Sequence, residues 1–316
     1  MIGRHKHCLG LADYARAEIE EVLDLAVSMK EVLRRPIKKV PSLRGKSVVN
    51  LFFEASTRTR SSFEIAAKVL SADALNWTSS GSSTSKGETL VDTARNLEAM
   101  RPDVLVIRHA SGGAPKLVAD HVGCAVVSAG DGAHEHPTQG LLDCFTLRER
   151  LGTLEGKTVA IVGDISHSRV ARSDLHAMPK LGARVRLCGP PTMIPAGVEE
   201  LGCTVHHDLR EAVDGADAVV TLRIQHERIG DPLIPNTREY SKFWGIGEKK
   251  AAEWLKPGCV ILHPGPINRG VELAPEVADG SRSVILDQVQ NGVAVRMAVL
   301  YLLCGGKAAE GVEGKA

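Results

Sequence analysis

Short apolar runs alternate with longer amphipathic stretches along nearly the whole chain, and this alternation restricts the fold more than any other feature. The runs are almost continuously apolar, as in VVNLFF. A strand of this kind is buried on both faces, and helical connections between strands make neighbouring strands parallel. The sequence therefore predicts an α/β fold with two doubly wound domains and parallel central sheets. The expected strands are 48–53, 104–108, 125–128, 159–162, 185–188, 218–222 and 260–263.

Amphipathic patterns between these runs predict helices. In the first helix, Ile19, Leu23 and Val27 form an apolar stripe between charged residues. The chain of 316 residues has room for about two domains of ordinary size. A long helix ends in the glycine-punctuated stretch RLGTLEGKTVAIVGD, so we place the domain boundary near residue 151. The expected helices are 13–34, 61–70, 90–100, 138–150, 172–181, 209–213, 248–255 and 288–303.

Composition and charge exclude several classes of protein. The net charge is +1 and aromatic residues make up 3% of the chain, which argues against a nucleic-acid partner or a membrane surface. The N-terminus MIGRHKHCLG has no apolar signal core, and no stretch reaches the ~20 apolar residues of a membrane span. Its His5, His7 and Cys8 could ligate a metal. No second ligand pair follows, so we expect a mobile, solvated terminus and no metal site.

The seven cysteines are scattered, odd in number and without a C-x-x-C pair. Several lie in apolar runs such as VRLCGP and GCVILHP. This pattern favours buried, reduced thiols over disulfides, and therefore a cytoplasmic protein.

The stretch VAIVGD at 159–164 is typical of the opening of a dinucleotide-binding fold. It continues as ISHSRVARSD, without the glycines of G-x-G-x-x-G that let the backbone approach a pyrophosphate. A G-x-x-x-x-G-K-[ST] phosphate loop is also absent from the sequence. We therefore expect no nucleotide and no other cofactor.

The stretch EASTRTR at 54–60 places hydroxyls and guanidiniums where a strand leads into a helix. A helix N-terminus offers unpaired N–H groups and a partial positive charge, and arginine provides planar forks for phosphate oxygens. A helix cap with surface arginines would explain Ser56 or Thr57. It would not explain Arg58 and Arg60 interleaved with hydroxyls at a strand end. We interpret the stretch as a phosphate cradle.

FFEASTRTR resembles the phosphate-binding segment of the carbamoyltransferase family, and HEHPTQGLLDCF at 134–145 resembles its second signature. The HPTQ form is similar to the aspartate carbamoyltransferases, whereas ornithine carbamoyltransferases typically carry HPCQ. Five further segments follow in the family's order, and the resemblance covers residues 8–303. They are SKGETLVDTARNLE, VIRHASGG, GDISHSRVARS, TLRIQHER and HPGPINRGVE.

The resemblance implies transfer of the carbamoyl group of carbamoyl phosphate to the amine of L-aspartate, in pyrimidine biosynthesis. The expected domains are 1–150 for carbamoyl phosphate and 151–287 for aspartate, with helix 288–304 packing back on the first and 305–316 a disordered tail. Long helices join them, and the active site lies in the cleft between them, shared by neighbouring subunits of a homotrimer. An association with dihydroorotase or regulatory chains stays open. Other readings are a different amine acceptor, or a non-catalytic subunit of the same fold.

The resemblance also assigns roles on the phosphate side. Ser56, Thr57, Arg58 and Thr59 hold the phosphate, with Thr59 also near the carbonyl oxygen. Arg108 reaches both phosphate and carbonyl oxygen. His136 donates to the carbonyl oxygen, and Gln139 accepts from the carbamoyl NH2 group. From the residues alone, His136 could instead be a structural residue at a helix start, because Pro137 follows it. Arg60 could be a structural ion-pair partner and not a ligand of the phosphate. No strong protein base is evident, and the resemblance implies that the departing phosphate takes the amine proton. The residues assigned to carbamoyl phosphate are Ser56, Thr57, Arg58, Thr59, Ser82, Arg108, His136, Gln139, Gly265 and Pro266.

On the aspartate side, the resemblance gives the α-carboxylate to Arg169 and the side-chain carboxylate to Arg223 with Gln225. Lys86, in the loop GSSTSKGE, reaches the neighbouring subunit's site with Ser82, although Ser83 or Ser85 could serve as the serine. Carbonyls of the turn at Pro264, Gly265 and Pro266 orient the carbamoyl NH2 group and the amine; the turn could also be merely rigid. The polar stretch 228–250 resembles the family's mobile closing loop. The residues assigned to aspartate are Lys86, Arg169, Arg223, Gln225, Pro264 and Gly265.

Overall fold

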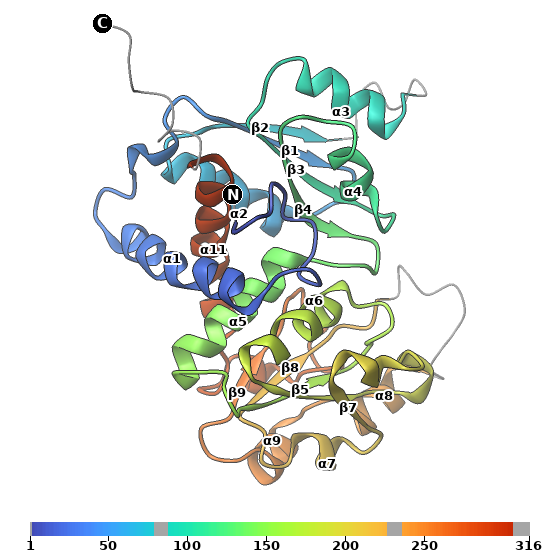
Figure 1. Cartoon of the computed structure of the whole chain (residues 1–316). Coiled ribbons are helices and arrows are strands. Elements are labelled where there is room, and N and C mark those ends of the chain that lie inside the picture. The colour runs from blue at the N-terminus through green and yellow to red at the C-terminus, as the bar shows by residue number, and fades with distance from the viewer. Residues whose placement is uncertain (1, 79–87, 226–235, 306–316) are drawn as a thin grey trace, which may run out of the picture. The chain divides into compact units, whose positions relative to one another are not determined.

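A computed structural model describes residues 2–78, 88–225 and 236–305. The chain forms two compact units. Unit 1 comprises Met1–Leu141 and Asn291–Ala316, and unit 2 comprises Leu142–Gln290. Each unit contains one parallel sheet with helices on it (Figure 1). The predicted fold class, two parallel-sheet α/β domains, is confirmed.

Unit 1 has the strand order β2-β1-β3-β4, all parallel. The chain runs from β1 outward to β2, returns to β3 beside β1, and continues to β4. The direction of winding therefore reverses between β1 and β3. The elements are α1 (Arg16–Arg34), β1 (Ser47–Phe52), α2 (Thr57–Val69), β2 (Asp73–Thr78), α3 (Leu90–Glu98), β3 (Val104–His109), α4 (Ala114–Ala119) and β4 (Ala125–Asp131). Two helices, α5 (Pro137–Leu151) and α11 (Ile285–Gly305), each contain a boundary between the units.

The core of unit 1 is built from the inner strands. Leu51 of β1 and Ile107 of β3 are fully buried and pack in one cluster with Val126 of β4. The part of α11 in unit 1 lies against α2 (Figure 1). There, the Arg296 guanidinium donates to the Ser62 hydroxyl at 3.0 Å and lies over the ring of Phe63.

The N-terminal segment differs from the expectation of a mobile, solvated terminus, which is wrong for its described residues. Ile2, Cys8 and Leu11 are fully buried. Cys8 adds a parallel bridge beside β4: its N–H donates to the Val126 carbonyl at 2.8 Å and its carbonyl accepts from Ser128 at 2.8 Å. The reason is that β4 would otherwise end the sheet with open hydrogen-bonding groups.

Unit 2 has the strand order β7-β6-β5-β8-β9, again all parallel. The chain winds from β5 outward to β7 and then returns to β8 beside β5, so the reversal lies between β5 and β8. The elements are β5 (Thr158–Val162), α6 (Arg169–Ala177), β6 (Arg184–Cys188), β7 (Cys203–His206), α7 (Leu209–Val213), β8 (Ala218–Thr221), α8 (Thr237–Phe243), α9 (Glu248–Trp254), β9 (Val260–Leu262) and α10 (Pro275–Ala278).

Two strands were not predicted. Both β2 and β7 are the edge strands of their sheets. An edge strand needs less apolar surface, and DALNWT and CTVH accordingly mix polar with apolar residues. The predicted helix 172–181 begins three residues earlier, at Arg169, and ends at Ala177. The expected closing loop 228–250 is described only from residue 236. There it forms α8, whose Tyr240 is fully buried.

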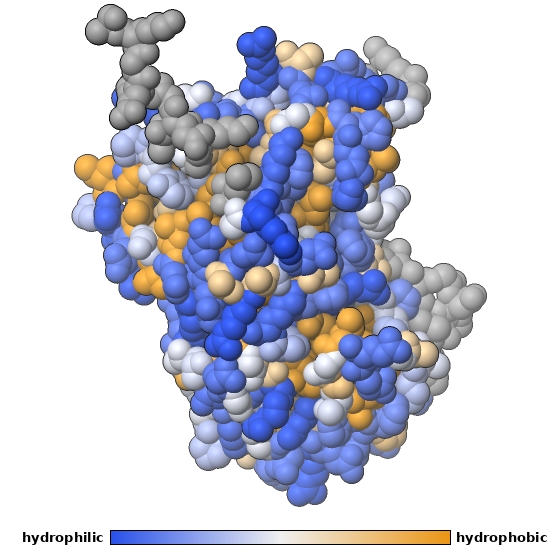
Figure 2. All heavy atoms as spheres, viewed as in Figure 1, coloured by the Kyte–Doolittle hydropathy of each residue, from blue (hydrophilic) through white to orange (hydrophobic). Residues whose placement is uncertain are grey.

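All seven cysteines are free, and six of them are buried, which confirms the prediction of buried thiols. Burial raises the pKa of Cys8, Cys188 and Cys304 to about 12. Among the described residues, no helix combines the length and hydropathy needed to span a bilayer. The visible surface is mainly hydrophilic, with small apolar areas (Figure 2).

Candidate functional site

The carboxyl ends of parallel strands meet at one edge of a sheet, and ligands of open α/β sheets bind where the winding reverses. In unit 1 this point lies between β1 and β3. Residues 56–59 follow β1, Arg108 lies at the end of β3, and His136 follows β4. The structure therefore places these predicted residues along the carboxyl edge of three adjacent strands.

The segment after β1 forms the first turn of α2. Ser56 is the N-cap residue, makes no side-chain capping bond within the described helix, and is followed by a first turn without an acidic residue. Thr57 and Arg58 are exposed, whereas Thr59 is buried. The open helix end, the hydroxyls and the guanidinium together form a favourable environment for an anion.

Arg108 connects the loops of this edge. Its Nε donates to Glu54 Oε2 at 3.2 Å, and its Nη1 donates to the Ala129 carbonyl at 3.3 Å. The ion pair is largely shielded, with 14% of the arginine side chain and 22% of the glutamate side chain exposed. The two bonds fix the guanidinium between the segment after β1 and strand β4.

His136 and Gln139 lie at the start of α5 and are both buried. The His136 carbonyl accepts from the N–H groups of Gln139 and Gly140, at 2.8 and 3.2 Å. The side chain thus lies at the point where β4 passes into the helix. His134, to which we assign no role, is half exposed and has its Nδ1 3.1 Å from Asp131 Oδ2.

In unit 2 the predicted aspartate-binding residues follow β5 and β8, the two strands at the reversal. Arg169 is the first residue of α6 and is 4% exposed. The helix is capped by Ser168, whose hydroxyl accepts from the Ala171 N–H at 3.1 Å. A helix N-terminus disfavours a cation, so a carboxylate reaching Arg169 would be stabilised by both the guanidinium and the helix.

Arg223 and Gln225 follow β8 and contact each other. Arg223 Nη2 donates to Gln225 Oε1 at 3.2 Å. The Gln225 N–H donates to Asp164 Oδ2 at 3.2 Å. These bonds orient the pair relative to the end of β5.

Asp164 is therefore an organising residue of this edge, and it is fully buried. Its Oδ1 accepts from the His167 N–H at 3.2 Å and lies 2.8 Å from His167 Nδ1, while Oδ2 holds Gln225. Gly163 lets the two loops approach: its φ is +135°, and a Cβ there would lie 2.7 Å from the Leu222 carbonyl. One carboxylate thus ties the loop before Arg169 to the segment with Arg223.

The turn at 264–266 follows β9, which is paired with β8. Pro264 and Gly265 are half-buried, and Pro266 is exposed. The φ of Gly265 is +66°, a conformation that favours glycine, and the Gly265–Pro266 peptide is cis. The three adjacent strands β5, β8 and β9 therefore each end in predicted binding residues.

Ser82 and Lys86 lie outside the described residues, as do the alternatives Ser83 and Ser85 and residues 226–235. The described residues contain no group of three or more His, Cys, Asp or Glu side chains arranged to hold a metal ion.

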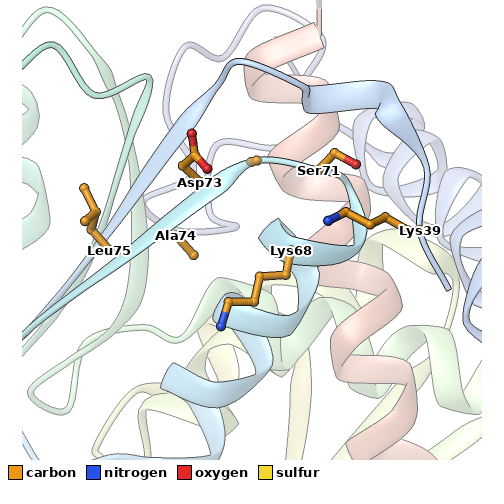
Figure 3. Close-up of a pocket in the computed structure, with 7 residues that line it drawn as sticks. Lys39, Lys68, Ser71, Asp73, Ala74 and Leu75 are labelled. Atoms are coloured by element: carbon orange, nitrogen blue, oxygen red, sulfur yellow. The ribbon is translucent and has the colours of Figure 1, made fainter.

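A surface pocket of about 600 Å³ in unit 1 lies away from the candidate phosphate cradle at the start of α2. It is lined by Lys39, Lys68, Ser71 and residues 72–75, at the C-terminal end of α2 and the start of β2 (Figure 3). α2 has 13 residues and is therefore about 20 Å long. The cradle lies at its other end, so the pocket is not part of the candidate site.

Sequence reasoning missed Glu54 and Asp164. Glu54 is the first residue of EASTRTR, and an acidic residue one strand away from Arg108 was a possible partner. Asp164 follows the run VAIVG directly, and a polar residue at the carboxyl end of a buried strand is a usual signal of a site. The partner of Glu54, Arg108, and one partner of Asp164, the Gln225 N–H, are distant in sequence, so the sequence alone does not show these bonds.

The chain belongs to the aspartate/ornithine carbamoyltransferase family. Residues 6–149 match the family model for the "carbamoyl-P binding domain", and residues 155–303 match that for the "Asp/Orn binding domain".

Within that family, the chain is 85% identical over 316 residues to the aspartate carbamoyltransferase catalytic subunit of Anaeromyxobacter sp. (strain Fw109-5), covering 100% of both chains. It is 60% identical to the subunit of that name from Geobacter sulfurreducens, covering 97% of this chain and 98% of the relative.

Solved structures agree with the fold. The aspartate transcarbamoylase of Trypanosoma cruzi in complex with carbamoyl aspartate and phosphate gives a TM-score of 0.86 at 30% identity, over 93% of this chain and 94% of that one. The ornithine carbamoyltransferase of Thermus thermophilus gives 0.84 at 30% identity, over 95% and 99%. The two scores are nearly equal, so the choice of acceptor depends on residues rather than on the fold.

Proposed function

We propose that this chain is an enzyme that transfers the carbamoyl group of carbamoyl phosphate to the α-amine of L-aspartate, giving N-carbamoyl-L-aspartate and phosphate in pyrimidine biosynthesis. The observation that carries the proposal is the full-length identity of 85% to a protein named aspartate carbamoyltransferase catalytic subunit. The cationic and hydroxyl residues at the winding reversals of both sheets support it.

The proposed reaction begins with the phosphate at the first turn of α2. Ser56, Thr57, Arg58 and Thr59 would supply hydroxyl, N–H and guanidinium donors, and Arg108, held by Glu54, would reach the phosphate and the carbonyl oxygen. His136 would donate to the carbonyl oxygen, and Gln139 would accept from the NH2 group. These donors would stabilise the negative charge that develops on the carbonyl oxygen.

The aspartate amine attacks the carbamoyl carbon. A C–N bond forms, the C–O bond to phosphate breaks, and the departing phosphate takes the proton from the amine. The acceptor is held by its two carboxylates, one on Arg169 and the other on Arg223 with Gln225. Ornithine lacks a second carboxylate for the latter pair, which favours aspartate.

The assay for this proposal measures carbamoyl-aspartate formation from carbamoyl phosphate and aspartate, with ornithine as control acceptor. We expect turnover with aspartate and none above background with ornithine. Turnover with ornithine or another amine would overturn the assignment of the acceptor. Inactivity of the folded chain with every amine would favour the non-catalytic alternative.

We propose that domain 1–150, with helix 288–304, binds carbamoyl phosphate, that domain 151–287 binds aspartate, and that the active site lies in the cleft between them. The matched family models support this division of labour. The seven free thiols support a cytoplasmic location.

We also propose a homotrimer in which Lys86 and Ser82 act in the neighbouring subunit's site. Lys86→Ala and Arg58→Ala chains should each be inactive. When they are mixed under conditions of subunit exchange, part of the activity should return, because at some interfaces an intact Arg58 of one subunit would meet an intact Lys86 of its neighbour. Mass measurement by light scattering confirms exchange and assembly. No recovery after confirmed exchange would contradict the shared site.

A further inference from the structure

His263, directly after β9, is hydrogen-bonded on both ring nitrogens. Nε2 lies 3.1 Å from Glu272 Oε1, and Nδ1 lies 2.7 Å from the backbone nitrogen of Gly265. The two side chains are 0% and 1% exposed. A backbone N–H can only donate, so Nδ1 must accept and Nε2–H must donate to the carboxylate. The neutral ring is therefore held in one tautomer and one orientation.

Glu272 holds both ends of the turn that follows β9. Its Oε1 accepts from His263 and also from the Asn268 N–H, at 2.6 Å. The ring fixes the start of the turn at Gly265, and the same oxygen fixes its end at Asn268.

The strand end is anchored as well. The His263 N–H donates to Gln288 Oε1 at 2.9 Å, and Gln288 Nε2 donates to Asp143 Oδ1 at 2.6 Å. Gln288 and Asp143 are buried, on α11 and α5, and all these residues belong to unit 2. The imidazole therefore projects from a fixed backbone position.

Because the peptide group is planar, these hydrogen bonds also set the direction in which the carbonyls of the turn point. The Pro264–Gly265 peptide is trans, so its carbonyl points opposite to its N–H. The bond from the Gly265 N–H to His263 thus turns the Pro264 carbonyl away from the buried ring. The carbonyl of Ile267 is oriented in the same way by the bond from Asn268 to Glu272. Backbone acceptors have no rotamers, so their direction depends entirely on such bonds.

We propose that His263 and Glu272 are positioning residues of the reaction: they hold the turn at 264–266 so that its carbonyls face the carbamoyl NH2 group and the incoming amine. This inference rests on the proposed function. Neither side chain touches the substrates; Glu272 acts through His263 and Asn268, and His263 acts through Gly265.

A matched pair of variants tests the carboxylate. Glu272→Gln and Glu272→Met have similar length, and both remove the charge, but only glutamine keeps an oxygen that can accept from His263 and Asn268. We expect Glu272→Met to lower kcat about tenfold or more and to raise KM for aspartate, while Glu272→Gln retains kcat within about threefold. Binding of inorganic phosphate, measured by calorimetry, should stay unchanged in both.

Thermal unfolding of each variant separates positioning from mere stabilisation. The inference is overturned if Glu272→Met and Glu272→Gln have the same kcat. It is also overturned if both variants have the kcat of the parent chain at a temperature at which they are fully folded. Should Glu272→Met fail to fold, His263→Asn and His263→Leu replace the pair, because asparagine Oδ1 can accept from the Gly265 N–H. We then expect asparagine to be about tenfold more active than leucine, and equal activities overturn the inference.

The parent chain distinguishes this inference from the proposed function. A parent that forms no carbamoyl-aspartate refutes the proposed function itself. A parent that is active, with variants that do not differ, refutes only the positioning role of the His263–Glu272 pair.

Discussion

The two units place their candidate binding residues by the same rule but hold them differently. In both, the residues lie at the carboxyl edge where the winding reverses, after β1 and β3 in unit 1 and after β5 and β8 in unit 2. In unit 1, Thr57 and Arg58 are exposed in the first turn of α2. In unit 2, Arg169 is buried, and Asp164 ties the segment with Arg223 to the loop before α6.

The difference corresponds to the proposed ligands. A phosphate presents several equivalent oxygens, which hydroxyls, N–H groups and guanidiniums can meet from several directions. Two carboxylates of one small molecule need two guanidiniums at a fixed separation, since bidentate pairing is directional. Unit 2 therefore relies on rigid placement, whereas unit 1 combines one fixed guanidinium, that of Arg108, with a larger number of donors.

The largest effect is expected from Arg108→Ala. The substitution removes a fixed donor from the phosphate side and leaves Glu54, an anion, without this guanidinium beside the cradle. We expect kcat/KM for carbamoyl phosphate to fall about 10²–10³-fold, the usual cost of losing such a donor. Steady-state kinetics and phosphate calorimetry measure it, with Glu54→Gln as a control that keeps the guanidinium and should lose less. Unchanged phosphate binding in Arg108→Ala would contradict the cradle.

A smaller effect, confined to the other substrate, is expected from Arg169→Lys. Lysine keeps the charge but not the fork, so kcat/KM for aspartate should fall about tenfold to 100-fold, while the Kd for phosphate stays within about twofold. Arg172→Lys is the matched control, because Arg172 lies on the same helix and is exposed. Equal losses of kcat/KM for aspartate in Arg169→Lys and Arg172→Lys, or a loss of phosphate binding in Arg169→Lys, would contradict separate roles for the two units.

The sequence predicted the inner strands of both sheets because each is buried on both faces and is continuously apolar. It also predicted the edge strands β4 and β9, which are apolar, but not the edge strands β2 and β7, in which polar and apolar residues are mixed. The N-terminal segment was also misjudged. Cys8 contributes mainly backbone hydrogen bonds beside β4, and such bonds leave no pattern in the side chains.

The residues of the candidate site also divide into those that the sequence indicates and those that it does not. The residues that we propose to face the ligands could be named from the sequence, because strand ends, hydroxyls and guanidiniums are visible in order along the chain and the resemblance supplied the proposed roles. The roles of Asp164 and Glu272 did not follow from the sequence: Asp164 accepts from the Gln225 N–H 61 residues away, and Glu272 accepts from His263 and Asn268 only because the turn after β9 brings them together. The partner of a buried carboxylate is set by the fold and not by local sequence.

The two units also differ in whether their buried carboxylates are hydrogen-bonded, and this difference should affect the stability of the fold. In unit 1, Glu135 accepts from the Leu11 N–H at 2.8 Å and Asp131 from the Gly113 N–H at 2.7 Å. In unit 2, neither oxygen of the buried Asp174 has a hydrogen-bond partner among the described residues. Burial and the neighbouring Asp143 raise the pKa of Asp174 well above its ordinary value.

The raised pKa gives a pH dependence with a definite sign. Folded Asp174 keeps a proton that the unfolded chain has lost, so the free energy of unfolding falls as pH rises from the unfolded pKa toward the folded one. Asp174→Asn should therefore raise Tm by about 2–4 °C at about pH 8 and give no such gain at about pH 4. Calorimetry at both pH values measures this. Asp131→Asn, which weakens a satisfied acceptor, should lower Tm near neutral pH; a gain there would contradict the comparison.

The smallest effect is expected at the opposite end of α2, where Lys68 lines the surface pocket. Lys68 is 62% exposed and pairs with Glu64 one turn earlier. An exposed pair of this kind contributes about 0.3–0.5 kcal/mol, so Lys68→Ala should change Tm very little. Phosphate binding should also be unchanged, because the lysine is about 15 Å from Arg58 along the helix. Arg58→Ala, at the N-terminal end of the same helix, should by contrast weaken phosphate binding strongly. A comparable loss in Lys68→Ala would show that α2 attracts the anion through its overall charge and not through the groups at its first turn.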